Sequence, residues 1–385
     1  MIATAIRTTV TIITLSTAIT SAIPSRNENQ ASDITNQIRE DQWHLRYLKV
    51  DKAHDISKGA GVLVAVPDTG IDKHPDLLKN LIKGVDLTAD SSSDGLEDLD
   101  SHGTGMAGLI SAHGQANKGA LGIAPQSKVL PIRIKSTNEG GSTGDLTTGI
   151  NFAISKRVSV ISISMTGNSD VQLQRAIEEA IRADIVVVAG AGNHPHQRTV
   201  GYPAAYPGVI AVGGIGPDGK HASTSVSGPE IDVVAPAVDI YSTSIDGKYR
   251  KGTGTSDATA IVAGAAALVR SKYPYLPAAE VVHRLTATAV DKGPPGRDDE
   301  YGYGVIDLVA ALTADVPPLG FESATAVPPS GGATGAAARP AGGDGGRGAA
   351  ARGWATLGVI VAAGCGFLVW RRRRRADDPP PRISR

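Results

Sequence analysis

Six short stretches of mostly β-branched residues recur along the middle of the chain, and each is apolar at consecutive positions. Near-continuous apolar runs of four to seven residues predict strands that are buried on both faces of a sheet. The predicted strands are 62–66, 129–134, 158–164, 185–190, 209–214 and 231–236.

Between several of these runs, apolar positions recur at helical spacing. Leu173, Ile177 and Ile181 form one such face, as expected for a helix packed on a sheet. Strands alternating with helices predict an α/β fold: a three-layer, doubly wound, mostly parallel sheet covered by helices on both sides. The predicted helices are 103–112, 143–156, 170–183, 257–272 and 278–287.

Four polar residues lie at the ends of these strands or the starts of these helices, where parallel sheets gather their chemistry. Asp68 follows the first strand, His102 precedes a Gly-rich helix, Asn193 ends "VVVAGAGN" and Ser256 begins "SDATAIVAG". Singly, each has an ordinary reading as a turn, loop or helix-capping residue. Together they match what a serine nucleophile requires: a base, an acid that orients the base, and a donor to the oxyanion.

Segments around these residues resemble those of the subtilisin-like serine proteases over roughly residues 40–312. They are "VPDTGIDKHPDL", "DSHGTGMAG", "LGIAP", "VISISM", "VVVAGAGN" and "GTSDATAIVAGAAALV". The resemblance implies that Asp68 orients His102, that His102 is the general base and acid, and that Ser256 is the nucleophile. It also implies an oxyanion hole made by Asn193 and the backbone N–H of Ser256. Ser256 is further expected to cap its own helix.

The same resemblance predicts where a polypeptide substrate lies. The substrate would extend along Ser164, Met165 and Thr166, with Gly190 and Ala191 forming the wall of the first pocket.

The chain departs from the usual pattern of this family at three positions near the site. Thr166 stands where glycine is usual, Asp257 where methionine is usual and Ala260 where proline is usual. Asp257 is the most consequential of the three, because we expect its carboxylate at the first helical position, close to both His102 and the oxyanion.

Composition restricts the cofactors and partners. The chain has 38 basic and 38 acidic residues, which gives no reason to expect nucleic acid as a partner. A single cysteine, Cys365, excludes an internal disulfide and a cysteine-built zinc site. The acidic run 86–100 is predicted to be a solvated surface loop, and His194 and His196 to be loop residues rather than metal ligands. Asp76 matches a calcium-ligand position of some subtilases, but no metal or cofactor is predicted.

The two ends of the chain predict export and anchoring. Arg7 precedes an uncharged stretch typical of a signal peptide. Residues 353–370 carry no charge, would span about 27 Å as a helix, and are followed by five arginines. We therefore expect a signal peptide (1–22), a short N-terminal extension (23–40), a catalytic domain (41–314), a Pro/Gly/Ala-rich linker (315–352), a transmembrane helix (353–370) and a basic cytoplasmic tail (371–385).

This organisation, together with "QWHLRYLKVDKA" before the first strand, is similar to that of the mycosins, membrane-anchored subtilases associated with type VII secretion in actinobacteria. It implies a serine endopeptidase at the cell membrane, with its catalytic domain outside the cytoplasm and with type VII secretion components as possible partners. The alternative is a scaffold subunit of a membrane secretion complex in which proteolysis is vestigial. A cell-wall-binding protein is a third reading, but the sequence has no aromatic-rich or repeated module to support it.

Overall fold

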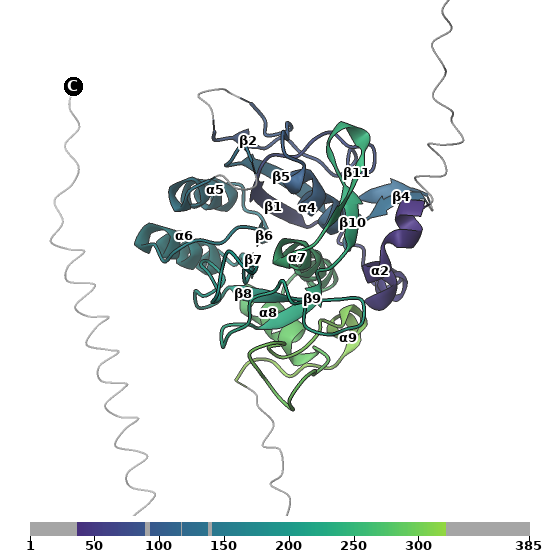
Figure 1. Cartoon of the computed structure of the whole chain (residues 1–385), viewed down its shortest axis with the longest axis vertical. Coiled ribbons are helices and arrows are strands. Elements are labelled where there is room, and N and C mark those ends of the chain that lie inside the picture. Colours follow the sequence, from purple (N-terminus) through teal and green to yellow (C-terminus); the bar gives the residue numbers. More distant parts are fainter. Residues whose placement is uncertain (1–36, 89–92, 117, 138–140, 321–385) are drawn as a thin grey trace, which may run out of the picture. The chain divides into compact units, whose positions relative to one another are not determined.

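The computed structural model describes residues 37–88, 93–116, 118–137 and 141–320 (Figure 1). The predicted signal peptide, transmembrane helix and cytoplasmic tail lie outside these residues. Within them, no helix is both long enough and apolar enough to cross a membrane.

A seven-stranded parallel sheet forms the centre of the described body, in the order β2-β5-β1-β6-β7-β8-β9. All six predicted strands are present within a few residues of their expected bounds. Strand β1 pairs with β5 on one side and with β6 on the other, so the chain reverses its direction of travel across the sheet beside β1. The bounds are β1 Leu63–Asp68, β2 Val85–Asp86, β5 Lys128–Arg133, β6 Val160–Ile163, β7 Val186–Gly190, β8 Ile210–Ile215 and β9 Val233–Pro236.

Helices cover both faces of this sheet, as the alternating pattern predicts (Figure 1). Helices α5 (Thr143–Ser155) and α6 (Val171–Arg182) pack together on one face. Helices α4 (His102–Ser111) and α7 (Thr255–Lys272) pack together on the other. Helix α7 is buried along most of its length, and its small residues allow close packing: a Cβ on Gly264 would lie 2.6 Å from Ile123.

Several elements were not predicted from the sequence. Strand β2 is only two residues long, and two short hairpins flank the main sheet. Among the described residues, helices α2 and α3 precede β1, and helices α8 and α9 follow α7. Of these four helices, only α8 was predicted. The additional bounds are β3 His113–Gln115, β4 Lys118–Leu121, β10 Ile240–Thr243, β11 Tyr249–Gly252, α2 Trp43–Tyr47, α3 Val50–His54, α8 Ala278–Ala287 and α9 Leu308–Thr313.

The segment that begins at residue 37 is hydrogen-bonded across the small hairpins. Arg39 Nε donates to the carbonyl of Gly119 at 2.9 Å, and the Gln42 side chain both donates to and accepts from the backbone of Leu121. Trp43 Nε1 donates to the carbonyl of Val238 at 3.0 Å. This segment is therefore part of the folded body.

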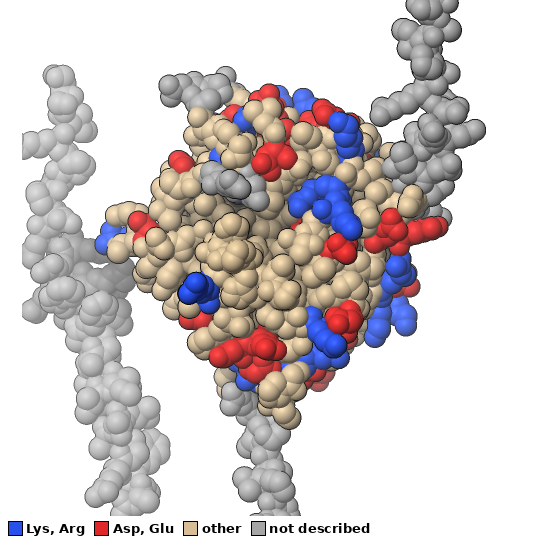
Figure 2. Space-filling view, viewed as in Figure 1, with Lys and Arg blue, Asp and Glu red and all other residues tan. Residues whose placement is uncertain are grey.

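On the face shown in Figure 2, lysine and arginine side chains are interspersed with aspartate and glutamate around the rim. The centre of that face consists mostly of uncharged residues. This face has no single-sign patch of the kind that attracts a polyanion.

Candidate active site

The end of strand β1 and the start of helix α4 bring Asp68 and His102 into contact. His102 Nδ1 lies 2.9 Å from both Asp68 Oδ1 and Asp68 Oδ2, and both side chains are buried. The backbone N–H of Thr69 also donates to Asp68, at 2.7 Å. Burial raises the pKa of Asp68, but His102, Lys135 and the Thr69 N–H together outweigh it and hold that pKa well below its usual range. An ionised Asp68 fixes the imidazole with its proton on Nδ1, which leaves Nε2 able to accept one.

The turn that delivers His102 is organised by Asp98, which is 5% exposed. Its carboxylate accepts hydrogen bonds from the backbone N–H groups of Asp100, Ser101 and Thr104, and from the Thr104 hydroxyl. The prediction of a solvated loop for the acidic run 86–100 was therefore wrong for Asp98, and it was also wrong for Asp86, which is buried and paired with Arg133. The turn needs an acceptor for several N–H groups at once, and Asp98 supplies it from a buried position.

Helix α4 also approaches strand β1 very closely at this point. A Cβ on Gly103 would lie 2.1 Å from the carbonyl oxygen of Gly70. Only glycine permits that approach, so the residue after His102 sets how near the imidazole comes to the end of β1.

Ser256 is the second residue of α7, whose N-cap is Gly254 with an extended backbone and no side-chain capping bond. The expectation that Ser256 caps its helix was therefore wrong. The orphan N–H of Thr255 is instead satisfied from outside the helix, by Asn193 Oδ1 at 2.9 Å. Ser256 is partly exposed between the buried Thr255 and Asp257, and it lies at the positive end of the helix dipole.

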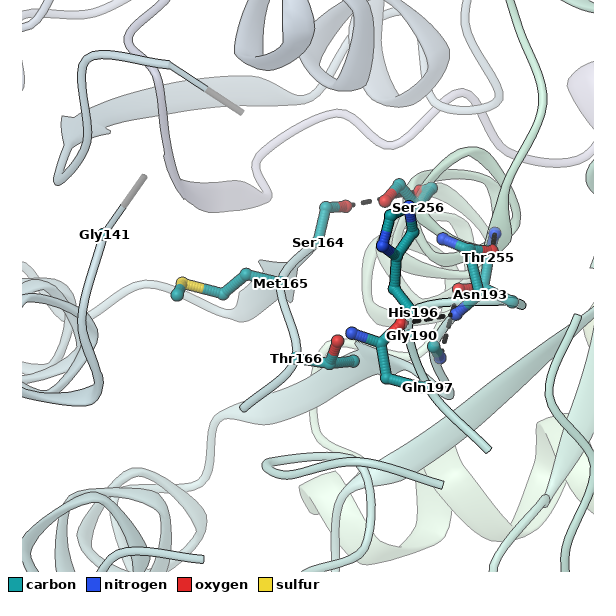
Figure 3. A pocket seen from close by; sticks show the side chains of 11 residues that line it. Gly141, Ser164, Met165, Thr166, Gly190, Asn193, His196, Gln197, Thr255 and Ser256 are labelled. Atoms are coloured by element: carbon teal, nitrogen blue, oxygen red, sulfur yellow. Dashed lines mark hydrogen bonds between the residues drawn. The ribbon is translucent and has the colours of Figure 1, made fainter. Parts of the chain in front are cut away.

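A cavity of about 550 Å³ opens beside Ser256. Ser164, Met165 and Thr166 line it opposite Asn193 and Ser256 (Figure 3). Gly190 also lines it, as predicted. Ala191 does not: it is fully buried, and its N–H donates to the carbonyl of Val212. The lining residues that were not predicted are Gly141, Gly192, His196, Gln197 and Thr255.

Two hydrogen bonds orient Asn193, one through its backbone and one through its side chain. Its backbone N–H donates to Gln197 Oε1 at 3.0 Å, and its side-chain oxygen accepts from Thr255. With the oxygen used in this way, the side-chain nitrogen Nδ2 is the atom of Asn193 that can donate to a ligand in the cavity. Ser164 Oγ donates to the carbonyl of Ser256 at 3.3 Å and joins the end of β6 to the same helix.

Asp257 is the third residue of α7 rather than the first, and it is 2% exposed. It does not line the cavity. Its Oδ1 is buried without a hydrogen-bond partner among the described residues, and so is Nη1 of Arg250. Burial raises the pKa of Asp257, while Arg250 and His102 act in the opposite direction.

The residues around Asp76 do not fit a calcium ion. Its carboxylate accepts hydrogen bonds from the Ala120 N–H, the Tyr249 hydroxyl and the Gln115 amide. Arg39 donates to the neighbouring carbonyl of Gly119. These donors occupy the oxygens that calcium would need as ligands. In the part of the chain that the structure describes, no group of three or more His, Cys, Asp or Glu side chains is arranged to hold a metal.

Comparison with known proteins agrees with this geometry. A model of the Subtilase family matches residues 59–304. The chain belongs to this family. It is 40% identical to Subtilisin E of Bacillus subtilis (strain 168) over 258 residues, which cover 66% of each protein. Over 72% of this chain and 74% of the relative, it is 36% identical to Mycosin-1 of Mycobacterium tuberculosis (strain ATCC 25618 / H37Rv).

Solved structures of one relative superpose well on this subtilase. The crystal structure of MycP1 with its N-terminal propeptide removed has a TM-score of 0.65 and 33% identity, over 71% of this chain and 98% of that one. A second structure, with a TM-score of 0.64, describes MycP1 as a serine protease and an essential component of the type VII (ESX-1) secretion system. The chain is thus a subtilase-family serine protease with a subtilisin-like α/β fold, close to the mycosins.

Besides the lining residues named above, sequence analysis also missed Lys135, and among the lining residues Gln197 is the one that orients Asn193. Lys135 follows the apolar run 129–134, and only the register between β5 and β1 places it beside Asp68. No sequence motif points to Gln197, and its role is recognisable only from the hydrogen bond that it accepts from the Asn193 N–H. A signal existed only for Lys135: a charged residue directly after a buried strand, at the edge of the sheet where the other candidates lie.

Proposed function

We propose that this subtilase is a membrane-anchored, extracytoplasmic serine endopeptidase that works through Asp68, His102 and Ser256. The observation that carries the proposal is the contact between His102 Nδ1 and both oxygens of buried Asp68. Asp68 and His102 do not line the cavity, but Ser256 does, as a partly exposed residue at a helix N-terminus, and its neighbour Asp257 lies within electrostatic reach of His102.

In the proposed reaction, Ser256 Oγ attacks the carbonyl carbon of the scissile peptide bond while His102 Nε2 takes the hydroxyl proton. His102 passes that proton to the leaving amine, and the acyl group remains on Ser256 as an ester. A water molecule, deprotonated by His102, then attacks the ester and releases the acid and the serine. Asp68 stays ionised throughout and stabilises the imidazolium that forms in each half of the reaction.

The negative charge that develops on the carbonyl oxygen needs donors that are already in place. Asn193 Nδ2 and the backbone N–H of Ser256 are the proposed donors, and the N-terminus of α7 favours the same charge. Ser164, Met165 and Thr166 line the cavity at the end of β6, where the backbone of an extended substrate would lie. Gly190 would form a wall of the first pocket.

Covalent labelling of the solubilised protein with a fluorophosphonate probe tests the nucleophile. Labelling should occur in the wild type and be absent in Ser256→Ala. Ser271→Ala is the matched control, because Ser271 lies near the other end of the same helix with its hydroxyl bonded to the carbonyl of Ala60. Equal labelling of wild type and Ser256→Ala contradicts the assignment, and a wild type that never labels favours the scaffold alternative.

We further propose that residues 353–370 anchor the enzyme in the membrane and that it acts with components of a type VII secretion system. Support comes from the uncharged stretch before five arginines and from the likeness to Mycosin-1 and MycP1. Protease added to intact cells should release the catalytic body by cutting within 315–352 and leave a small membrane-bound stub. A body that is digested only after cell lysis would contradict the proposed topology.

A further inference from the structure

A lysine is buried beside the carboxylate that holds His102. Lys135 Nζ lies 3.7 Å from Asp68 Oδ1, and each of the two side chains is 1% exposed. Strands β1 and β5 pair in parallel with Asp68 opposite Arg133, so Lys135 follows the end of β5 at the edge of the sheet where Asp68 lies. A buried ammonium is tolerated only beside compensating groups, and Asp68 is one such group.

The stem of Lys135 is fixed against the wall of the cavity. A Cβ built on Gly141 would lie 3.2 Å from Lys135 Cβ and 3.4 Å from its Cδ. Gly141 itself lines the cavity beside Ser256 and has a φ of +94°, in the region that favours glycine. The lysine is thus packed between the proposed catalytic pair and the cavity wall, which restricts where its ammonium can go.

Among the described residues, the charged groups that act on the Asp68–His102 pair or on the neighbouring Asp257 come from four different elements. Asp68 ends β1, Lys135 follows β5, Arg250 belongs to β11 and Asp257 to α7. Lys135 is paired with Asp68, and Asp257 interacts electrostatically with both Arg250 and His102. In general, a carboxylate near an imidazole favours its charged form and a cation disfavours it. One further titratable group, His196 in the loop after β7, lines the cavity.

We propose that Lys135 is a positioning residue for the Asp68–His102 pair. Its ammonium holds the carboxylate where both oxygens meet His102 Nδ1, and its charge keeps the imidazole neutral to lower pH than the carboxylate alone would allow. The proposal rests on the function proposed above, because it assigns a role within the same triad. Its consequence is an enzyme whose base remains able to accept the Ser256 proton in mildly acidic surroundings.

The pH dependence of kcat/KM tests this role with three variants. Lys135→Met keeps the length of the stem and removes the charge, so the acid limb should move to higher pH by about one unit. Lys135→Arg restores a cation and should bring the limb back toward its wild-type position. Lys128→Met is the control: it removes a lysine from the start of β5, roughly 16 Å by strand spacing from the end of that strand beside Asp68, and should leave the limb in place.

His196 also lines the cavity, so the comparison is repeated in a His196→Gln background, where Lys135→Met should still shift the acid limb. Superimposable acid limbs for wild type and Lys135→Met, in an enzyme that hydrolyses peptide, overturn the proposal while leaving the triad intact. A wild type that neither hydrolyses nor labels at Ser256 refutes the proposed function instead. If Lys135→Met and Lys135→Gln both fail to fold while Lys135→Arg folds, the ammonium supports the fold rather than His102, and the proposal is wrong.

Discussion

Two buried carboxylates act on His102, and they are held in opposite ways. Asp68 contacts His102 Nδ1 through both oxygens, accepts from the Thr69 N–H and is paired with Lys135. Asp257 lies one residue after the proposed nucleophile, yet its Oδ1 has no hydrogen-bond partner within the described residues. Accordingly, the pKa of Asp68 is lowered and that of Asp257 is raised.

The contrast shows what separates the carboxylate proposed to be catalytic from one that is only nearby. Both residues are buried, so burial alone does not distinguish them. What differs is the number of donors aimed at the charge, because each donor offsets the loss of solvation and fixes the orientation of the group. Asp68 can therefore remain ionised and in place, whereas Asp257 modulates the field at His102 without touching it.

The largest effect should come from removing the proposed nucleophile or the imidazole on which both carboxylates act. Ser256→Ala and His102→Ala should each lower kcat by a factor of the order of 10⁶, since the triad works as a unit. Ser256→Ala removes a single oxygen atom, so its melting temperature should stay close to that of the wild type, whereas His102→Ala also removes a partner of the buried Asp68 and should melt at a lower temperature. The loss is measured as peptide hydrolysis by the purified protein. A Ser256→Ala variant that keeps most of its activity would show that Ser256 is not the nucleophile.

Asp68→Asn should separate the two carboxylates most clearly. The amide keeps the shape but can no longer hold His102 in the required tautomer, so kcat should fall by about 10⁴. Asp257→Asn, measured in the same assay, should change kcat far less. Equal losses in both variants would mean that donors around the carboxylate do not define its role.

Asn193→Ala tests the oxyanion side of the reaction, where Asp257 can only oppose the developing charge. The loss of one donor should cost roughly 10²–10³ in kcat with little change in KM. The N–H of Thr255 also loses its acceptor in this variant, so a thermal melt is recorded alongside the kinetics. A raised KM at unchanged kcat would instead identify Asn193 as a residue that only binds substrate.

The smallest effect should be a shift in pH dependence for Asp257→Asn. An ionised Asp257 favours the imidazolium form of His102, so its removal should move the acid limb of kcat/KM to lower pH. The direction is opposite to that expected for Lys135→Met, which makes the two variants controls for each other. Coincident limbs for wild type and Asp257→Asn would mean that the field of Asp257 does not reach the base.

Much of this architecture could be predicted from the sequence because the buried strands and amphipathic helices have strong apolar periodicity. The long runs such as 185–190 indicated both the strands and the polar residues that follow them. Strand β2 and the two hairpins were missed because they are short and partly exposed. Their sequences therefore lack the run of consecutive apolar residues that identifies a buried strand.

The site was less predictable wherever its contacts join segments that are distant in sequence. Whether Ser256 capped its helix depended on Asn193, which satisfies the first N–H of α7 from another loop. Asp98 was predicted to be solvated, and Lys135, which directly follows the predicted strand 129–134, was assigned no role. Local sequence spacing encodes neither the burial of these residues nor their partners. The order of Asp68, His102, Asn193 and Ser256 was visible because each stands at a strand or helix end.

The hydrogen bonds of the segment around Arg39 set a limit on how this protein can be matured by proteolysis. Arg39, Gln42 and Trp43 supply donors to carbonyls in two separate hairpin regions of the catalytic body. A cut that removed these residues would leave those carbonyls without their partners and would uncover the buried His44 and Leu45 beside them. We therefore expect any N-terminal trimming that preserves the folded enzyme to end before Arg39, so that the new terminus remains bonded to the body.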